Sequence, residues 1–319
     1  MPFLRFLIII FCLVCASCVM AKPLNQNEML IRCQNRGWTE VKFKINNIER
    51  RLLYKLPQGE WINGAIAVMH GGGGQAEHFC DDSLNLVRPQ VRFTEMALKD
   101  NFAVLALDST SIVSDEAGFT CGKIWDDEVR SRENLDLPYL KHIFTNIIPS
   151  LRKKEDNKSI FLTGLSSGGY MTVRGATHLG DLITAFAPIS NGDPYGWQRK
   201  CDPKYGNSRD NVKGAGFDNE TKKQIIEENS CLSEIYPNEK KWDAFLGIKP
   251  KFRLFHSKYD GINDYSCGLK MEKQLLAHGF EGEPVYLLKN DGGKRQVINH
   301  FWHNEYNAEL LQFFKRNIK

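Results

Sequence analysis

The serine with the strongest case for chemistry is Ser166, which lies in the sequence Gly-Leu-Ser-Ser-Gly at positions 164–168. This stretch matches the pattern G-x-S-x-G, with an apolar run at 160–162 before it and a helix-compatible segment after it. Strand, sharp turn and helix form the context in which the pattern presents a nucleophilic serine above a sheet. The alternative is a loop rich in Gly and Ser that has no catalytic role.

A serine hydroxyl becomes a good nucleophile only when a base takes its proton. In α/β hydrolases the order along the chain is serine, acid, histidine, and reactive groups gather beyond the carboxyl ends of the strands. Asp260 follows an apolar run at 252–255, so we expect its carboxylate to orient the histidine. A solvated turn aspartate before Gly261 is the alternative, and Asp264 is the second candidate for the acid.

Three histidines follow Asp260 in the chain, and one of them is the expected base. His278 lies in an expected helix, where packing or capping is its expected role. His300 and His303 both lie between the last expected strand and the last expected helix. His300 is preferred because His303 is expected to open that helix, which begins at Asn304.

The oxyanion of an acyl-transfer intermediate requires backbone N–H donors. One expected donor is the amide of Ser167, and the other comes from the four glycines after His70. Gly72 is the first choice within this loop and Gly71 the second. A phosphate-binding loop is the alternative, but the G-x-G-x-x-G spacing and the P-loop lysine are both missing. For His70 we expect a structural role.

The elements that must position these residues follow from the hydrophobic pattern. Residues 22–37 form a polar lead-in, and Asn46-Asn47 predicts a hairpin between the first two strands. From there strands and helices alternate, which predicts an α/β fold with a mostly parallel sheet and helices on both faces. We expect strands at 38–45, 51–56, 65–69, 102–107, 160–162, 182–189, 252–255 and 285–288, and helices at 91–99, 135–151, after Ser166, 269–278 and 304–314.

One segment interrupts this alternation. Residues 191–249 separate two strands by nearly sixty positions and are rich in Gly, Asn, Lys and Glu. Loops of this length are uncommon inside a domain unless they act as lids or binding loops. We expect a lid-like insertion over the active-site side, with a purely decorative surface excursion as the alternative.

The N-terminus has the form of a secretory signal peptide. A short basic start is followed by an apolar core at 6–15 and by Val19-Met20-Ala21, which fits the small-x-small rule for cleavage. We therefore expect a signal peptide at 1–21 and a single mature domain at 22–319, secreted or periplasmic. A lipoprotein signal ending at Cys18 is the rival interpretation, and an uncleaved anchor is a further one.

Six cysteines remain after the expected cleavage: Cys33, Cys80, Cys121, Cys201, Cys231 and Cys267. An even number in an exported chain predicts up to three disulfides. The pairing that we expect is Cys80 with Cys121, Cys201 with Cys231, and Cys33 with Cys267. No C-x-x-C pair is present in the mature sequence, which argues against a zinc ribbon or a redox motif.

The formal net charge is only +4, and the basic residues are scattered. Without a basic run to follow a phosphate backbone, nucleic acid is not an expected partner. We expect no stable membrane span after signal cleavage. The chemistry outlined above calls for no metal and no organic cofactor.

The chain resembles the secreted polyhydroxybutyrate-depolymerase and feruloyl/acetylxylan-esterase branch of the α/β hydrolases. Residues 68–74 (Val-Met-His-Gly-Gly-Gly-Gly) are similar to its oxyanion loop, 164–171 (Gly-Leu-Ser-Ser-Gly-Gly-Tyr-Met) to its elbow, and 186–190 (Phe-Ala-Pro-Ile-Ser) to the strand after it. Residues 256–260 (His-Ser-Lys-Tyr-Asp) resemble its H-G-x-x-D motif, and 300–302 (His-Phe-Trp) its terminal H-x-W. The likeness extends from about 65 to 314, apart from the insertion.

The sequence also departs from that pattern. Ser257 replaces the usual glycine, and the glycine-rich approach to the final histidine is displaced to Asp291-Gly292-Gly293. The long insertion has no counterpart in the family pattern. These departures affect the expected substrate more than the expected catalysis.

The resemblance implies a serine esterase that uses Ser166, His300 and Asp260. Candidate walls for the acyl or aromatic part of a small or polymeric ester are Trp125, Tyr170, Trp197 and Trp302, with packing in the core, the more common role of such aromatic residues, as the alternative. Two rival functions stay open. A serine peptidase of the prolyl-oligopeptidase type could use the same triad, and a non-catalytic envelope or carbohydrate-binding protein could keep the fold.

Overall fold

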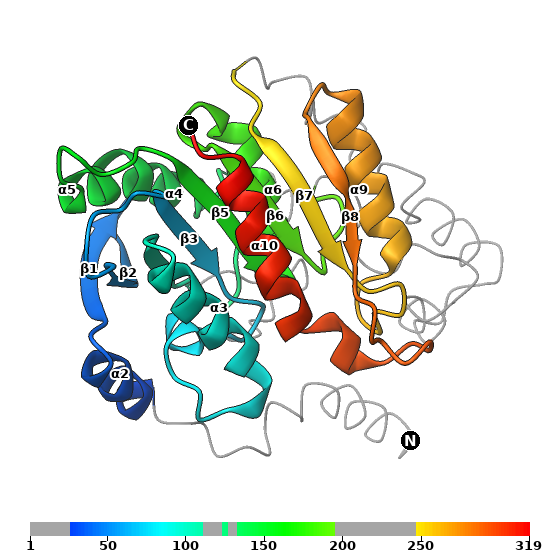
Figure 1. Ribbon diagram of the computed structural model, residues 1–319, viewed down its shortest axis with the longest axis horizontal. Coiled ribbons are helices and arrows are strands. Elements are labelled where there is room, and N and C mark those ends of the chain that lie inside the picture. Colours follow the sequence, from blue (N-terminus) through cyan, green and yellow to red (C-terminus); the bar gives the residue numbers. More distant parts are fainter. Residues whose placement is uncertain (1–25, 111–122, 127–132, 195–246) are drawn as a thin grey trace, which may run out of the picture.

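The computed structural model describes residues 26–110, 123–126, 133–194 and 247–319 (Figure 1). The expected signal peptide lies outside these residues, as does most of the 191–249 insertion. Trp197, Cys121, Cys201 and Cys231 lie outside them as well.

The described strands form one mixed sheet in the order β1-β2-β4-β3-β5-β6-β7-β8. β1 and β2 pair antiparallel, β2 also runs antiparallel to β4, and every other pairing is parallel. The expected mostly parallel α/β sheet is therefore confirmed. The strand bounds are β1 Thr39–Ile45, β2 Ile48–Lys55, β3 Ala65–Met69, β4 Ala103–Leu107, β5 Ile160–Leu165, β6 Ala185–Ile189, β7 Lys251–His256 and β8 Gly282–Leu287.

The predicted hairpin is present between β1 and β2. Asn46 and Asn47 both have positive φ, at 49° and 65°, and Ile45 pairs with Ile48 across the turn. Asparagine tolerates this left-handed backbone better than most side chains, which is why the pair favours a two-residue hairpin. The second strand begins at Ile48 rather than at the predicted position 51.

Helices cover both faces of the sheet, and the central strands are buried between them. On one face pack α4, α5, α6 and α9, and on the other pack α2, α3 and α10, of which α3 and α10 lie in front of the sheet in Figure 1. Every residue of β3, β4, β5 and β6 is buried, as expected for continuous apolar strands in a parallel sheet. The helices are α2 Gln26–Asn35, α3 Arg88–Lys99, α4 Leu137–His142, α5 Ile148–Leu151, α6 Ser167–His178, α9 Tyr265–Ala277 and α10 Asn304–Arg316.

The N-terminal part of the described chain differs from prediction. The polar lead-in contains α2, whose Met29 and Cys33 are buried. Cys33 forms a disulfide with Cys80, so the predicted pairings of Cys33 with Cys267 and of Cys80 with Cys121 are wrong. The physical reason is that α2 packs on the 3₁₀ turn Ala76–Phe79, which brings two cysteines 47 positions apart into contact.

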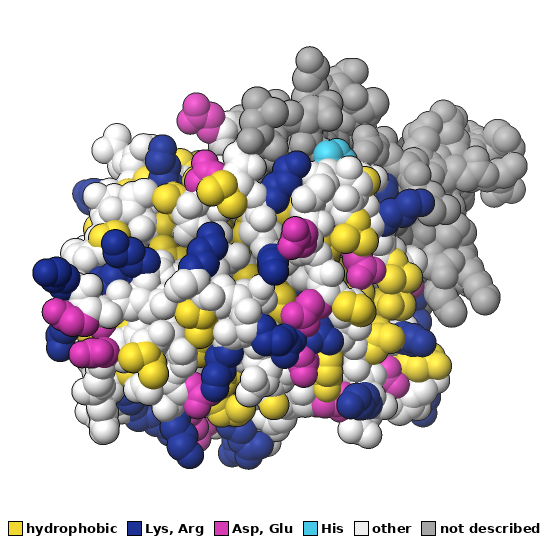
Figure 2. Space-filling model, turned by 45° about the horizontal axis from the view of Figure 1, so that its top comes forward, with side chains coloured by type: hydrophobic (Ala, Val, Ile, Leu, Met, Phe, Trp, Pro, Cys, Tyr) yellow, Lys and Arg dark blue, Asp and Glu magenta, His cyan; other side chains and the backbone are white. Residues whose placement is uncertain are grey.

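The surface mixes charges of both signs. On the face shown in Figure 2, Lys and Arg side chains are interspersed with Asp and Glu. Within the described ranges, no helix combines the length and the apolar character that crossing a membrane requires.

Candidate active site

Ser166 occupies a strained turn between β5 and α6. Its backbone has φ 54° and ψ −118°, a conformation that residues with a side chain rarely adopt. Hydrogen bonds hold the turn on both sides: Ser166 N donates to Ile189 O at 2.9 Å, and Tyr170 N donates to Ser166 O at 2.9 Å. Such a turn directs the serine away from the sheet, and Ser166 keeps partial exposure among buried neighbours.

The glycines of the G-x-S-x-G pattern are required by close backbone packing. A Cβ on Gly164 would lie 2.4 Å from Gly168 O. A Cβ on Gly168 would lie 2.5 Å from His70 O, in the loop that follows β3. No side chain fits at either distance, so these glycines let β5, α6 and the glycine loop approach one another.

Asp260 and His300 meet at the carboxyl edge of the sheet. His300 Nδ1 lies 2.9 Å and 3.1 Å from the two carboxylate oxygens of Asp260. The carboxylate oxygen Oδ1 also accepts the amides of Ile262 at 2.7 Å and Asn263 at 2.9 Å. Asp260 is thus fixed by its own turn and holds the imidazole from one side.

The surroundings keep Asp260 ionised. Burial alone raises the pKa of Asp260, but the His300 ring and the Ile262 amide stabilise the carboxylate, and the net pKa lies below the ordinary value of 3.8. With Nδ1 directed at Asp260, Nε2 is the ring nitrogen of His300 left for a reacting group. Among the described residues no hydrogen bond joins His300 to the Ser166 hydroxyl; in unliganded enzymes this contact is often long and shortens when substrate binds.

The alternatives to Asp260 and His300 are engaged elsewhere. Asp264 caps α9 by accepting the Ser266 amide at 2.9 Å and pairs with Arg295 at 2.6 Å. His303 is the residue before α10, and its Nε2 lies 3.0 Å from Ile298 O. The structure therefore brings Asp260 together with His300 and not with His303.

Two hydrogen-bonding side chains join the Asp260 loop to the His300 loop. The buried Asn299 donates to Tyr259 O at 3.1 Å and to Asp291 O at 2.9 Å. Ser257, the residue that departs from the family pattern, donates to the Asp291 carboxylate at 3.1 Å. Ser257 and Asp291 each belong to a departure from the family pattern, and their hydrogen bond connects the loop of Asp260 with the loop of His300.

The glycine loop after β3 makes a tight turn. Gly73 has φ +73° and donates its amide to Lys123 O at 2.7 Å, while Gly74 N donates to Gly71 O at 2.9 Å. Within the part of the chain that the structure describes, the amides of Gly71 and Gly72 have no backbone acceptor. They are the two amides of this loop that remain for a ligand.

Gly72 lies against the start of α6. A Cβ built on Gly72 would be 3.9 Å from Ser167 Cβ. Ser167 is the first residue of α6, so its amide is one of the N-terminal amides without an acceptor inside the helix. Gly72 and Ser167 therefore come from distant parts of the chain and present unused amides beside Ser166.

The fold of this chain is similar to that of solved structures. S-formylglutathione hydrolase FrmB from Staphylococcus aureus aligns with a TM-score of 0.52 at 13% identity, over 87% of this chain and 98% of that one. An acylaminoacyl peptidase from Pyrococcus horikoshii aligns with a TM-score of 0.52 at 17% identity, over 88% of this chain. A thermostable esterase aligns with a TM-score of 0.49 at 15% identity, also over 88% of this chain. The first two of these likenesses show that the fold is that of the α/β hydrolases.

At these identities the likeness to the α/β hydrolases establishes the fold and not the substrate. The chain spans 63% of the length of the esterase and 42% of the length of the peptidase. Neither a protein-family model nor a curated protein sequence matches the chain.

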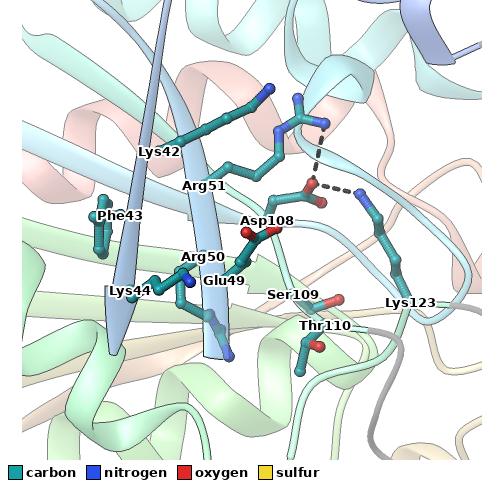
Figure 3. Close-up of a pocket in the computed structure, with 10 residues that line it drawn as sticks. All are labelled: Lys42, Phe43, Lys44, Glu49, Arg50, Arg51, Asp108, Ser109, Thr110 and Lys123. Carbon is teal, nitrogen blue, oxygen red and sulfur yellow. Dashed lines mark hydrogen bonds and ion pairs between the residues drawn. The ribbon is translucent and has the colours of Figure 1, made fainter. Parts of the chain in front are cut away.

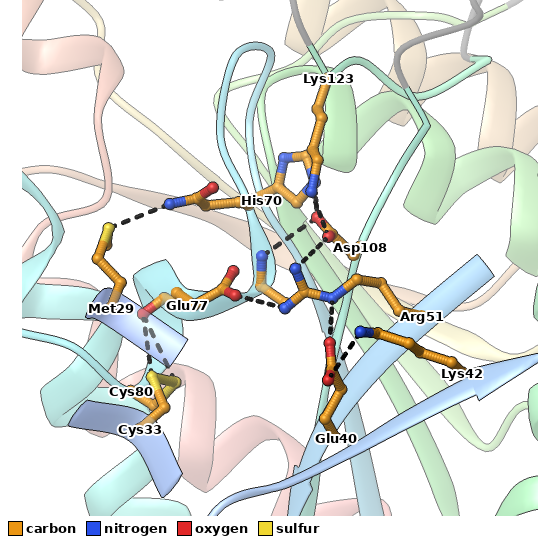
Figure 4. A network of polar contacts seen from close by, with 12 residues as sticks. Met29, Cys33, Glu40, Lys42, Arg51, His70, Glu77, Cys80, Asp108 and Lys123 are labelled. Carbon is orange, nitrogen blue, oxygen red and sulfur yellow. Dashed lines mark hydrogen bonds and ion pairs between the residues drawn. A yellow bond between two sulfur atoms is a disulfide. The ribbon is translucent and has the colours of Figure 1, made fainter. Parts of the chain in front are cut away.

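Behind the glycine loop of this α/β-hydrolase fold lies a charged network that the sequence analysis missed (Figure 4). Asp108, the residue after β4, contacts Arg51 at 3.4 Å, His70 Nε2 at 3.4 Å and the Lys123 ammonium. Burial raises the pKa of Asp108, but His70, Lys123 and Arg51 outweigh it and lower the pKa to about 2. The ring of the buried His70 also lies 3.1 Å from the Ser109 amide nitrogen, so its contacts are structural.

A cavity of about 430 Å³ adjoins this network (Figure 3). It is lined by Lys42, Phe43, Lys44, Glu49, Arg50, Arg51, Asp108, Ser109, Thr110 and Lys123. Its buried cations already have carboxylate partners, since Arg50 pairs with Asp136 and Arg51 with Glu77. We therefore assign this cavity no anion-binding role.

The aromatic residues expected to form substrate walls are buried in the α/β-hydrolase core. Trp125 is 0%, Tyr170 3% and Trp302 1% exposed. Trp302 packs against Phe79 and Phe93, with ring centroids 6.0 Å and 5.3 Å away. Large aromatic rings contribute most when they are removed from water, and these three offer no open wall in this structure. No group of three or more His, Cys, Asp or Glu side chains in the described ranges is placed to hold a metal ion.

Proposed function

We propose that this protein is a secreted or periplasmic serine esterase that hydrolyses carboxylic esters. The observation that carries the proposal is the Asp260–His300 pair at the carboxyl edge of the sheet on which Ser166 stands in a strained turn. An acid that orients a histidine, and a serine lifted from the sheet, are the components of nucleophilic acyl transfer.

In the proposed mechanism the Ser166 hydroxyl oxygen attacks the ester carbonyl while His300 Nε2 takes its proton. The amides of Gly72 and Ser167 stabilise the oxyanion of the tetrahedral intermediate. His300 then donates the proton to the departing alcohol, which leaves an acyl-serine. Water activated by His300 releases the acid, and Asp260 stabilises the imidazolium in both steps. The mechanism requires neither a metal ion nor an organic cofactor.

The proposed substrates are those of the branch that the sequence resembles: polyhydroxyalkanoates, or feruloyl or acetyl esters. The four motifs at 68–74, 164–171, 256–260 and 300–302 support this choice. A serine peptidase of the prolyl-oligopeptidase type is the rival that shares the chemistry, and hydrolysis of peptides in preference to esters would favour it.

Export is part of the proposal. It is supported by the basic start, the short apolar core and the small-x-small site at 19–21. The Cys33–Cys80 disulfide is compatible with an oxidising compartment, since disulfides persist in secreted and periplasmic proteins.

The test uses the mature chain from Lys22 onward, folded under oxidising conditions. We expect hydrolysis of short- and medium-chain p-nitrophenyl esters, and we expect Ser166→Ala to lower kcat by at least about 10⁴-fold because the nucleophile is lost. Chain-length preference then sizes the acyl pocket.

A second measurement is independent of substrate choice. A fluorophosphonate should label Ser166, as located by peptide mass spectrometry, and should leave Ser166→Ala unlabelled. Well-folded wild-type protein that neither turns over esters nor reacts with the fluorophosphonate would reject the esterase proposal in favour of a non-catalytic binding protein.

A further inference from the structure

The segment Lys123–Asp126 contacts both elements that carry the proposed oxyanion donors. Lys123 O accepts the Gly73 amide at 2.7 Å, on the glycine-loop side. On the elbow side, Trp125 N donates to Ser167 Oγ at 3.2 Å. The indole Nε1 of Trp125 donates to His70 O, at the start of the glycine loop, at 2.8 Å.

We propose that Trp125 is a positioning residue of the oxyanion hole, whose two N–H groups set the spacing between Gly72 and Ser167. The inference rests on the proposed serine-hydrolase function. It assigns Trp125 a role different from the substrate wall expected from the sequence.

The geometry of an oxyanion hole requires this kind of support. Donors must lie about 2.7–3.1 Å from the developing oxyanion, so a small shift of one donor removes much of its effect. Gly72 follows β3 and Ser167 begins α6, and the described residues show no hydrogen bond between them. Trp125 links the two elements, and Ile124 Cδ1 would lie 3.9 Å from a Cβ built on Gly72, so the residue before Trp125 also packs close to the loop.

Trp125 is itself rigidly held. Its ring is fully buried and lies 5.3 Å from the His70 ring and 6.4 Å from the Tyr139 ring, between centroids. Lys123, two residues before it, is anchored by its ion pair with Asp108 (Figure 4). Because Trp125 is buried and held on both sides, its hydrogen bonds can fix the positions of His70 O and Ser167 Oγ.

The kinetic test replaces Trp125 by phenylalanine, which keeps an aromatic ring and removes the indole N–H. We expect kcat for a p-nitrophenyl ester to fall about tenfold with KM nearly unchanged, because removing an oxyanion donor outright costs roughly 100- to 1000-fold. Ser167→Ala removes the other end of the link. Since both changes break one bridge, the double variant should lose little more activity than the worse single variant.

Hydrogen exchange gives a readout that needs no turnover. The peptide containing the glycine loop 71–74 should exchange faster in Trp125→Phe than in wild type. The matched control is Trp61→Phe. Trp61 is a buried core tryptophan that, among the described residues, forms hydrogen bonds through its backbone and not through its indole, so the change should leave both kcat and loop exchange unchanged.

The outcomes separate the two proposals. Wild-type turnover lost in Ser166→Ala, together with wild-type kcat and loop exchange in Trp125→Phe, would overturn the inference and leave the esterase intact. Faster exchange of the glycine loop in Trp125→Phe but not in Trp61→Phe would support the proposed role of Trp125, even if no ester is turned over. Equally fast loop exchange in both variants would mean that Trp125 acts only through ordinary core packing, and would overturn the inference.

Discussion

Ser166 stores backbone strain at the point where the proposed chemistry takes place. A residue held at φ 54° and ψ −118° costs on the order of 1–3 kcal/mol, which the surrounding structure must offset. Two hydrogen bonds and the close packing at Gly164 and Gly168 over-determine the turn. Strain of this kind keeps the hydroxyl oriented before substrate arrives.

At the same scale, histidine substitutions distinguish the proposed base from its neighbour. His300→Ala should lower kcat by at least about 10³-fold, because it removes the group that moves the proton. His303→Ala should lower kcat less than about tenfold, since its Nε2 contacts Ile298 O and not Asp260. Steady-state assays of the two purified variants decide this, and a larger loss in His303→Ala would reassign the base.

Among the elements, the ends of β2, β3 and β4 are joined by charge as well as by the sheet. Arg51 on β2 and His70 after β3 both contact Asp108, the residue after β4. Lys123 adds the segment that holds Gly73. The polar network therefore fixes the loop whose amides the mechanism uses.

Asp108 should make this network sensitive to acid. Its pKa of about 2 lies below its ordinary 3.8, so folding favours the carboxylate. The resulting stability, about 2 kcal/mol for such a shift, is fully present above the unfolded pKa and is lost as pH falls through the folded one. Urea unfolding at several pH values should show Asp108→Asn less stable than wild type at neutral pH, with the gap closing toward pH 2. A gap that is constant with pH would contradict this linkage.

The whole molecule is a sheet covered on two faces, and its N-terminal end is secured by a covalent bond. The Cys33–Cys80 disulfide spans 47 positions and ties α2 to the turn before α3. α2 has few buried residues of its own, Met29 and Cys33, and it is attached both by the cross-link and by two hydrogen bonds from Arg32 to Asp81, at 3.0 and 2.9 Å.

Replacing both cysteines by alanine should lower the free energy of unfolding by about 2–4 kcal/mol, because the unfolded chain regains the freedom that the closed loop removed. Denaturant titration of the double variant and of wild type, both under oxidising conditions, measures the difference. Ester hydrolysis of the folded double variant should remain near wild type, since both sulfurs lie in α2 and its contact turn. Equal stability of the two proteins would contradict the expectation.

The alternation of elements and the fold class are evident from the residue pattern alone. Strands β3 and β4 are continuous apolar runs, the Asn46-Asn47 turn requires left-handed backbone, and the elbow glycines belong to a short motif within one stretch of the chain. These signals are local, so they can be recognised without knowing what lies across the sheet.

Other features depend on residues that are distant in sequence, and they are evident only in the folded structure. The partner of Cys33 and the burial of Trp125 between the glycine loop and the elbow both join segments that the pattern did not place side by side. The contact of His300 with Asp260, by contrast, was expected from the order of the motifs along the chain. α2 was not predicted because it has few buried residues and its sequence is mostly polar. Its packing on the turn at Ala76–Phe79 is a contact between distant segments that the sequence pattern does not reveal. Local periodicity specifies elements, whereas the contacts among them follow from which faces the folded chain buries together.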